Sequence, residues 1–419
     1  MVSLRLTRGD ASISLPGACC YVFTLARTMS PAIKICLIGN PDSIHVQRWA
    51  RHFSQKGFEV SLLSYYQPRV TFNGNPRVHF LRPRGPGARR AGARSVAAMS
   101  RFPGMVRLIT ATRLRAAGFY RELSRINPDI VHAHYVSDYG FLAAVSGRHP
   151  MVVSAWGSDL LIDPHRSGIT RRLVRWVLSR ADLVTYNAES LGQAARAMGA
   201  PPERLLQVVM GVGSEMIEAL RIQAVEPAGR EPLILSQRSL ERSVYNVDVL
   251  INAMPEVLRR VPAARLVVGS DGALRGQLED LSRRLGVAGA VEFAGSAMWP
   301  AGLAERLGRA AVYVSVPSSD GTSVTLLEAL AAGAYPIVSD LPSNREWVTP
   351  EGGTVVPVRE VAPLADAIVS ALQDSTLRSM AAVHNREVIN QRGLWEVNMT
   401  RMESAYRDLV KRNPGGDGS

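Results

Sequence analysis

Short apolar runs alternate with amphipathic stretches over most of this 419-residue chain. In its first half the runs that predict buried strands are at residues 33–38, 58–63, 78–81, 129–132, 151–156, 181–186 and 206–210. Helical spacing follows Ser43 up to about Lys56 and returns at residues 188–198. Strands that alternate with helices in this way predict a largely parallel sheet whose loops gather at one edge.

A second set of alternating elements begins after residues 224–230, where Pro, Gly and charge interrupt the periodicity and mark a linker. Strands are predicted at residues 233–236, 265–269, 290–293, 312–316 and 354–358, and helices near 247–260, 273–285, 323–332, 362–372, 377–389 and 394–410. The fold class is therefore α/β, with two doubly wound domains at residues 32–223 and 231–393. Residues 1–31 and 413–419 are expected to be an unstructured extension and tail.

The most informative stretch, residues 312–346, reads as a strand, a polar loop at 317–322, a helix at 323–332 closed by Gly333, and a second strand. The loop feeds a helix N-terminus, where unpaired N–H groups and the helix dipole favour an anion. Asp320 and Glu328 flank that position. A nucleotide-sugar, with phosphates between hydroxyl-bearing groups, suits this layout, although similar turns occur without ligands and such acids are often only solvated.

The amino-acid composition limits the classes of molecule that the protein is expected to bind. The formal charge of +13 comes almost wholly from arginine, because only Lys34, Lys56 and Lys411 are lysines. A basic balance fits nucleic acid, an anionic membrane or an anionic substrate. The chain has neither zinc-finger spacing nor interleaved aromatic and basic residues, which argues against nucleic acid. The arginines of residues 95–125 indicate either a solvated helix face or a surface that docks a lipid-linked acceptor on an anionic membrane.

Cysteine usage and hydropathy bear on the compartment. Cys19, Cys20 and Cys36 give neither a disulfide framework nor a metal spacing, which fits a reducing, cytoplasmic location. No apolar run reaches the length of a membrane span. Asp10 and the break at residues 16–17 argue against a signal peptide, and Met29 is an alternative start.

Residues 319–340, SDGTSVTLLEALAAGAYPIVSD, resemble the donor-site segment of the retaining GT-B glycosyltransferases, glycosyl transferases group 1 (family 4-like). The family pattern is an acid, seven residues, then Glu. Its first acid is usually Glu, and here it is Asp320. The resemblance extends over about residues 33–395. It implies two Rossmann-like domains facing a central cleft, the first for the acceptor and the second for the nucleotide-sugar donor, with a helix at 394–412 that crosses back to the first domain.

The resemblance also implies donor-side roles. Arg238 occupies the family's arginine position for the diphosphate, and Tyr245 replaces the usual lysine, so either Arg242 or Tyr245 takes that place. Glu328 would accept hydrogen bonds from the ribose and Asp320 from the sugar. Further donor-binding residues are the backbone amides of Gly321, Thr322, Ser323 and Val324, the loop glycines Gly269 and Gly272, and Gly39 after the first strand. No Asp-x-Asp triad or cofactor motif is present, so no metal and no cofactor are expected.

On the acceptor side many relatives carry a His after the fifth strand, where this chain has Trp156 and Asp159. Trp156 would stack on a sugar or fill core, and Asp159 would orient a hydroxyl. His132 and His134 are candidates for acceptor contact or proton transfer, or else space-filling side chains at a strand end.

The predicted function is transfer of a hexose or N-acetylhexosamine from a UDP- or GDP-sugar to a glycan, lipid-linked or small-molecule acceptor, with retention. Two alternatives remain. The sugar-nucleotide 2-epimerases share the architecture, and a non-catalytic nucleotide-sugar binding protein is suggested by Asp320 and Tyr245.

Overall fold

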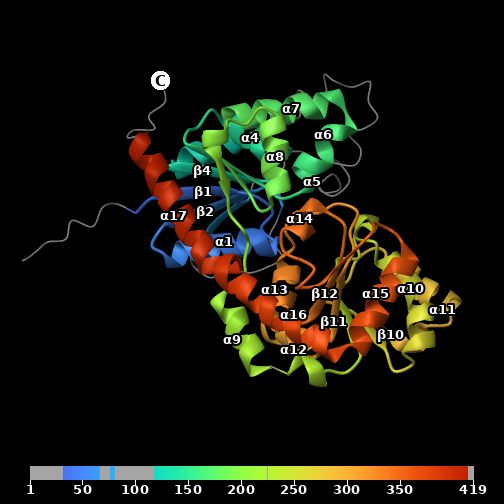
Figure 1. Cartoon of the computed structure of the whole chain (residues 1–419). Coiled ribbons are helices and arrows are strands. Elements are labelled where there is room, and N and C mark those ends of the chain that lie inside the picture. Colours follow the sequence, from blue (N-terminus) through green and yellow to red (C-terminus); the bar gives the residue numbers. More distant parts are fainter. Residues whose placement is uncertain (1–31, 67–75, 81–117, 224, 414–419) are drawn as a thin grey trace, which may run out of the picture. The chain divides into compact units, whose positions relative to one another are not determined.

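A computed structural model describes residues 32–66, 76–80, 118–223 and 225–413 of the chain. Within them are two parallel β-sheets flanked by helices (Figure 1). This confirms the α/β fold class that the sequence predicts. The predicted extension at residues 1–31, the arginine-rich segment at 82–94 and most of residues 95–125 lie outside the described residues.

The first sheet has seven strands in the order β3-β2-β1-β4-β5-β6-β7. Its strands are β1 (Lys34–Ile38), β2 (Glu59–Ser64), β3 (Arg77–Phe80), β4 (Ile130–His134), β5 (Met151–Ala155), β6 (Leu183–Tyr186) and β7 (Leu205–Gln207). The accompanying helices are α1 (Ile44–Gln55), α4 (Tyr139–Ser146), α5 (Ser158–Leu161), α6 (Asp163–Arg166), α7 (Gly168–Arg180) and α8 (Glu189–Ala197), with a further helix at residues 118–126.

The second sheet has six strands in the order β10-β9-β8-β11-β12-β13. Its strands are β8 (Leu233–Ser236), β9 (Arg265–Val268), β10 (Val291–Phe293), β11 (Val312–Ser315), β12 (Tyr335–Ser339) and β13 (Thr354–Val356). Its helices are α9 (Ser214–Ile222), α10 (Val247–Arg260), α11 (Arg275–Arg284), α12 (Ala301–Arg309), α13 (Val324–Ala332), α14 (Pro342–Arg345), α15 (Val361–Gln373) and α16 (Ser375–Val388), and α17 (Trp395–Arg412) follows them.

Each sheet contains a switch point, a pair of adjacent strands from which the chain adds further strands in opposite directions along the sheet. In the first sheet it lies between β1 and β4, and in the second between β8 and β11. Ligands of doubly wound folds bind outside the carboxyl ends of the strands at such a point. The second switch point brings the loop after β8, which carries Arg238, beside the loop after β11, which leads into α13.

Alternating side chains along each strand divide the core between the two faces of a sheet. In β1, Ile35 and Leu37 pack with α1 and α17, whereas Cys36 and Ile38 pack with α4, α7 and α8. In the second sheet Ile234 faces α10 and α15, while the next residue, Leu235, faces α9, α12 and α13. Because both faces of each sheet are covered, the strands read as continuous apolar runs.

The chain passes between the two cores near Gly211 and again near Gly393. A Cβ on Gly211 would lie 2.1 Å from the carbonyl oxygen of Gly393, so the two passages touch through their backbones. Helix α9, which the sequence places in the domain that ends at residue 223, packs in the second core through Met216 and Leu220. Its amphipathic pattern does not say which sheet it covers. Helix α17 packs beside α1 (Figure 1). Between the two helices the Trp49 Nε1–H donates to the Tyr406 hydroxyl at 3.1 Å.

No helix in the described part of the chain is long and apolar enough to cross a membrane.

Candidate functional site

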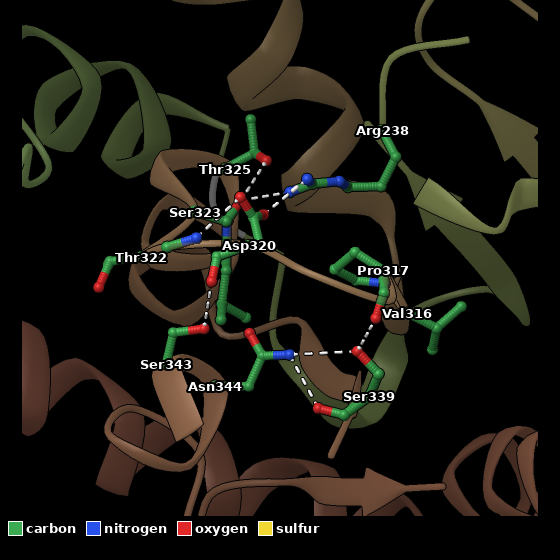
Figure 2. A network of polar contacts seen from close by, with 12 residues as sticks. Arg238, Val316, Pro317, Asp320, Thr322, Ser323, Thr325, Ser339, Ser343 and Asn344 are labelled. Atoms are coloured by element: carbon green, nitrogen blue, oxygen red, sulfur yellow. Dashed lines mark hydrogen bonds and ion pairs between the residues drawn. The ribbon is translucent and has the colours of Figure 1, made fainter. Parts of the chain in front are cut away.

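The loop between β11 and α13 is held by side chains that each bond one of its carbonyl groups, and Figure 2 shows the bonds from Ser339 and Ser343. Asn246 Nδ2 donates to Val316 O at 2.9 Å, Ser339 Oγ to Pro317 O at 2.7 Å, and Ser343 Oγ to Asp320 O at 3.0 Å. These bonds satisfy backbone groups that a buried loop would otherwise leave unpaired. The loop therefore has a fixed shape before any ligand binds.

Helix α13 begins at this loop, and Ser323 is its N-cap. The Ser323 hydroxyl accepts from the Leu326 amide at 3.4 Å. The first amides of a helix have no partner within the helix, and those of Val324 and Thr325 have no other acceptor among the described residues. At its other end α13 stops at Gly333, which adopts the left-handed conformation. The sequence predicted the end of this helix at Gly333 correctly and placed its start at Ser323, one residue before Val324.

Arg238 lies at the same helix N-terminus (Figure 2). Its Nη1 donates to Ser323 Oγ at 2.9 Å and its Nη2 to Asp320 Oδ2 at 2.6 Å, and the side chain is only 7% exposed. The guanidinium carbon is 4.3 Å from the ring centroid of Tyr245. Tyr245 therefore supports Arg238 through its ring face, and the exposed Arg242 lines the same space. The structure thus brings the predicted diphosphate-binding residues together.

Glu328 is on the buried face of α13 and is 2% exposed. Trp299 Nε1–H donates to its Oε1 at 3.1 Å. Burial raises the pKa of Glu328 to about 7, and the hydrogen bond from Trp299 and the positive charge of Arg48 oppose that rise. Arg48 belongs to α1 of the first half and donates to Gly211 O at 2.9 Å. Nothing in the spacing around Arg48 or Trp299 marked them as site residues, because their neighbours come from distant elements.

These groups surround a cavity of about 510 Å³, a size typical of small-molecule sites. Both halves of the chain line it. The first half contributes Ile44, His45, Arg48, Trp156, Ser158, Ile162 and Asn187, and the second half contributes Gln237, Arg238, Arg242, Tyr245, Trp299, Asp320, Thr322, Ser323, Val324 and Glu328, among others.

Several buried polar atoms of this lining have no hydrogen-bond partner among the residues that the structure describes. They are His45 Nδ1, Trp156 Nε1, Gln237 Oε1 and Arg238 Nε. Buried polar groups are normally paired, so a cluster of unpaired ones in a single cavity indicates a site that a ligand completes.

Two of the predicted donor amides are already engaged. The Gly321 N–H donates to Oδ1 of the preceding residue, Asp320, at 3.0 Å, and the Thr322 N–H donates to Asn187 Oδ1 at 3.4 Å. Thr322 Oγ1 also donates to Asn187 O at 2.6 Å, and a Cβ on Gly321 would come within 2.5 Å of Asn187 Oδ1. Gly321 and Thr322 thus hold the loop between β11 and α13, called the donor loop below, against the first half of the chain. The amides of Ser323 and Val324 are left to bind a ligand.

The other predicted glycines serve close packing and do not line the cavity. A Cβ on Gly269 would lie 1.8 Å from Gln237 Oε1, and one on Gly272 would lie 2.3 Å from the Leu240 carbonyl carbon. Because they have no side chain, the loop after β9 can pack closely against the loop that carries Arg238. Gly39 is buried between Val46 and His134.

His132, His134 and Asp159 also lie outside the lining, which does not support their predicted contact with the acceptor. His132 is fully buried, and its ring bonds Tyr406 of α17 at 2.5 Å and Ser154 of β5 at 2.7 Å. The ring of His134 stacks on the ring of His132, and their centroids are 4.4 Å apart. Asp159 is also fully buried, and its carboxylate accepts the amides of Val136, Trp156 and Gly157. Its role is to hold the loop that presents Trp156.

A second cavity, of about 590 Å³, lies beside β8, β9 and β10 and is lined in part by Arg265, Arg306 and Arg309. None of the predicted site residues lines it, and acids such as Glu231 and Glu305 accompany its arginines.

Comparison with protein families gives two matches in sequence order. Residues 34–188 match the glycosyl transferase 4-like family, and residues 231–374, which include Arg238, Asp320 and Glu328, match glycosyl transferases group 1. Together the matches cover well over half of the chain.

Curated relatives are similar over part of their length. A phosphatidyl-myo-inositol mannosyltransferase of Mycobacterium tuberculosis is 29% identical over 202 residues, 46% of this chain and 50% of that protein. The GDP-mannose:cellobiosyl-diphosphopolyprenol alpha-mannosyltransferase of Xanthomonas campestris is 27% identical over 257 residues, 58% of this chain and 64% of that protein. The chain thus spans about half the length of the mycobacterial relative that it matches.

Solved structures resemble nearly the whole chain. Sucrose-phosphate synthase from Thermosynechococcus elongatus aligns with a TM-score of 0.70 and 19% identity, over 91% of this chain and 100% of that chain. Anabaena HepE in complex with UDP-glucose aligns with a TM-score of 0.68 and 14% identity, over 90% of this chain and 100% of that chain. These likenesses establish the fold, and with the two family matches they show that the chain belongs to the GT-B glycosyltransferases, its first half to the glycosyl transferase 4-like family and its second half to glycosyl transferases group 1.

Proposed function

We propose that the protein transfers a sugar from a nucleotide-sugar to a hydroxyl group of an acceptor. The observation that carries the proposal is the convergence, in one cavity, of the α13 N-terminus, Arg238 and Glu328. Free helix amides and a buried arginine recognise a diphosphate. A buried carboxylate recognises the paired hydroxyls of a ribose.

In this arrangement the diphosphate lies at Ser323 and Val324 beside Arg238, and the ribose lies toward Glu328. Positive groups placed at the leaving diphosphate stabilise the negative charge that develops on it as the bond to the sugar breaks. The acceptor hydroxyl attacks the sugar from the face that carries the leaving diphosphate, and its proton passes to the leaving phosphate oxygen. The transfer therefore retains the configuration at the sugar and requires no nucleophilic side chain.

Residues of the first half line the other side of the cavity and limit the access of water. Asn187, through its bonds to Thr322, fixes that wall against the donor loop. Exclusion of water favours transfer to the acceptor over hydrolysis of the donor.

We further propose that the reaction needs no divalent metal, because Arg238 and the helix amides neutralise the diphosphate. Among the described residues no group of three or more His, Cys, Asp or Glu side chains is placed to hold a metal ion.

For the donor we propose a hexose or N-acetylhexosamine carried by UDP or GDP. One relative is named as a GDP-mannose-dependent transferase, and one structural neighbour was crystallised with UDP-glucose. A glycan, a lipid-linked glycan or a small molecule each remains open as the acceptor. Helix α7 favours the lipid-linked option, because it exposes Ile169 and Trp176 beside Arg172 and Arg175 and contains no acid. Sedimentation with vesicles of anionic and of neutral lipid tests that option.

The experiment that tests the function has two steps. Thermal unfolding is first measured with UDP, GDP, UDP-glucose, UDP-N-acetylglucosamine and GDP-mannose, since a ligand at about 100 times its Kd stabilises the folded state by about 2.7 kcal/mol. Release of nucleotide is then followed with and without acceptor. Release that depends on acceptor supports the transferase, and interconversion of the nucleotide-sugar without acceptor would indicate the epimerase. Binding with neither reaction would indicate a binding protein, and no stabilisation by any nucleotide would refute the proposal.

A further inference from the structure

Two aromatic side chains of the first half form one wall of the cavity. His45 is in the first turn of α1, and Trp156 follows the last residue of β5. Their ring centroids are 4.7 Å apart. Both line the cavity, and in each ring one buried nitrogen, Nδ1 of His45 and Nε1 of Trp156, has no partner in the described part of the chain. The fold thus leaves one ring nitrogen unpaired, among the described residues, on each of two adjacent rings in the cavity wall.

The surrounding structure fixes this wall. The backbone N–H of Trp156 donates to Asp159 Oδ1 at 3.0 Å, and its ring packs 5.5 Å from that of His134. The neighbouring Ser158 hydroxyl, which also lines the cavity, is 2.8 Å from the Tyr135 hydroxyl. The wall is therefore preorganised, and the unpaired nitrogens do not result from a loose loop.

The chemistry of the pair selects one kind of group. Burial, aided by the positive charge of Arg48, lowers the pKa of His45 to about 4, so its ring is neutral at pH 7. A neutral imidazole has one donor and one acceptor nitrogen, whereas an indole N–H only donates. With the imidazole proton on Nε2, a hydroxyl group satisfies both residues, because it accepts from Trp156 Nε1–H and donates to His45 Nδ1. A phosphate oxygen accepts but has no proton to give to the imidazole.

We propose that His45 and Trp156 form a subsite that binds and orients the hydroxyl of the acceptor, a sugar or polyol. The inference rests on the proposed function. The acceptor is the substrate concerned because Arg238, Ser323 and Glu328, which suit the donor, all come from the second half. The aromatic faces of both rings also suit the C–H surface of a sugar.

The subsite is tested with methyl α-mannoside and methyl β-glucoside as probes. Their binding is measured by saturation-transfer NMR on the whole chain, in the presence of whichever nucleoside diphosphate stabilises the wild type. Trp156→Phe keeps an aromatic ring at this position but removes the five-membered ring of the indole together with its N–H, and His45→Ala removes the imidazole. Each is expected to weaken the binding of the probe by about tenfold, the effect of losing one buried hydrogen bond, with the Kd of the nucleoside diphosphate within about twofold of wild type.

A matched control is His165→Ala on α6, which changes the same residue type as His45→Ala at an exposed position. It should bind the probes as the wild type does. His45→Asn, which keeps a hydrogen-bonding side chain, should retain more binding than His45→Ala, and this separates a contact with the ligand from a general loss of packing.

Unchanged binding of the probes in Trp156→Phe and His45→Ala would overturn the inference, as would a wild type that binds nucleotide but neither glycoside. Loss of affinity for the nucleotide-sugar with unchanged affinity for the nucleoside diphosphate would also overturn it, because the pair would then contact the donor sugar. Failure of the proposed function itself is distinguishable, because it would show as a wild type that binds no nucleotide.

Discussion

We expect the protonation of Glu328 to make donor binding depend on pH. Burial raises its pKa to about 7, against the opposing influence of the Trp299 hydrogen bond and the Arg48 charge. In the proposed complex two ribose hydroxyls donate to this carboxylate. Only the ionised carboxylate accepts both bonds, so binding of a nucleotide-sugar is expected to strengthen as the pH rises through 7.

The magnitude follows from that pKa. If only the ionised form binds, the apparent Kd should fall by about tenfold between about pH 6 and about pH 8, which is about 1.4 kcal/mol. At about pH 6 and below, binding should release close to one proton for each donor bound.

The same group affects folding in the opposite sense. Its pKa in the folded chain is above the ordinary value of 4.5, so the folded state binds the proton more tightly than the unfolded state does. This contribution, of about 3 kcal/mol, is present below pH 4.5 and is lost as the pH rises to about 7. His45 and His134, whose pKa values burial lowers to about 4 and about 3, act in the opposite direction over much of that range. The wild type must therefore be compared with Glu328→Gln at each pH, since the histidines are common to both.

The assay is titration calorimetry with a nucleotide-sugar across this pH range, in buffers of different ionisation enthalpy. A nucleotide-sugar is used because the terminal phosphate of a free nucleoside diphosphate itself titrates near pH 6. Glu328→Gln should bind more weakly at pH 8 and show no dependence on pH. Equal pH dependence in both proteins, or tighter binding at low pH, would refute the placement of the ribose at Glu328.

Four further outcomes are expected. Arg238→Ala should lower kcat/KM by a factor that corresponds to a loss of about 3 kcal/mol of transition-state stabilisation, because it removes a buried cation from the leaving group. Steady-state kinetics at saturating acceptor will measure this factor, and a loss below tenfold would contradict the role of Arg238. Asp320→Asn should lower transfer by about 2 to 4 kcal/mol while calorimetry shows nucleoside diphosphate binding as tight as in the wild type or tighter, since Arg238 loses its competing partner. Gly321→Ala should lower Tm and transfer together, because its Cβ would lie 2.5 Å from Asn187 Oδ1; unchanged values of both would show that this contact is not needed. Activity should be the same after dialysis against EDTA, and a loss that Mg²⁺ or Mn²⁺ restores would disprove the metal-independent mechanism.

The parts of the structure that sequence predicts best are those determined locally. The strand predicted at 312–316, the helix start predicted at Ser323 and the stop at Gly333 are encoded within about twenty residues, and each lies within one residue of its place in the structure. The approach of Arg238 to Asp320, across 82 residues, required knowledge of which strands are neighbours. The family resemblance supplied that knowledge, and the β8–β11 switch point accounts for it physically.

The parts that sequence did not predict depend on contacts between distant elements. His132 has the pattern of a functional histidine at a strand end, but its partner is Tyr406, 274 residues away, so its burial was not visible. Asp159 was placed near the site, yet three nearby amides occupy its carboxylate. Arg48 and His45 were missed because their helix reads as an ordinary amphipathic helix until the second half is packed against it.

The pairing of Arg238 with Asp320 explains how the shorter acid of this chain fits a position where relatives usually have Glu. One carboxylate oxygen of Asp320 accepts from Arg238 at 2.6 Å, and the other accepts from the Gly321 amide at 3.0 Å. A buried cation without a partner is strongly destabilising, so Asp320 keeps Arg238 charged and aimed at the α13 N-terminus in the absence of donor. A diphosphate that arrives there meets a cation already in place and contributes the second negative group. In the proposed complex we therefore expect Asp320 to act on the donor first through Arg238, with its remaining lone pairs available to the sugar.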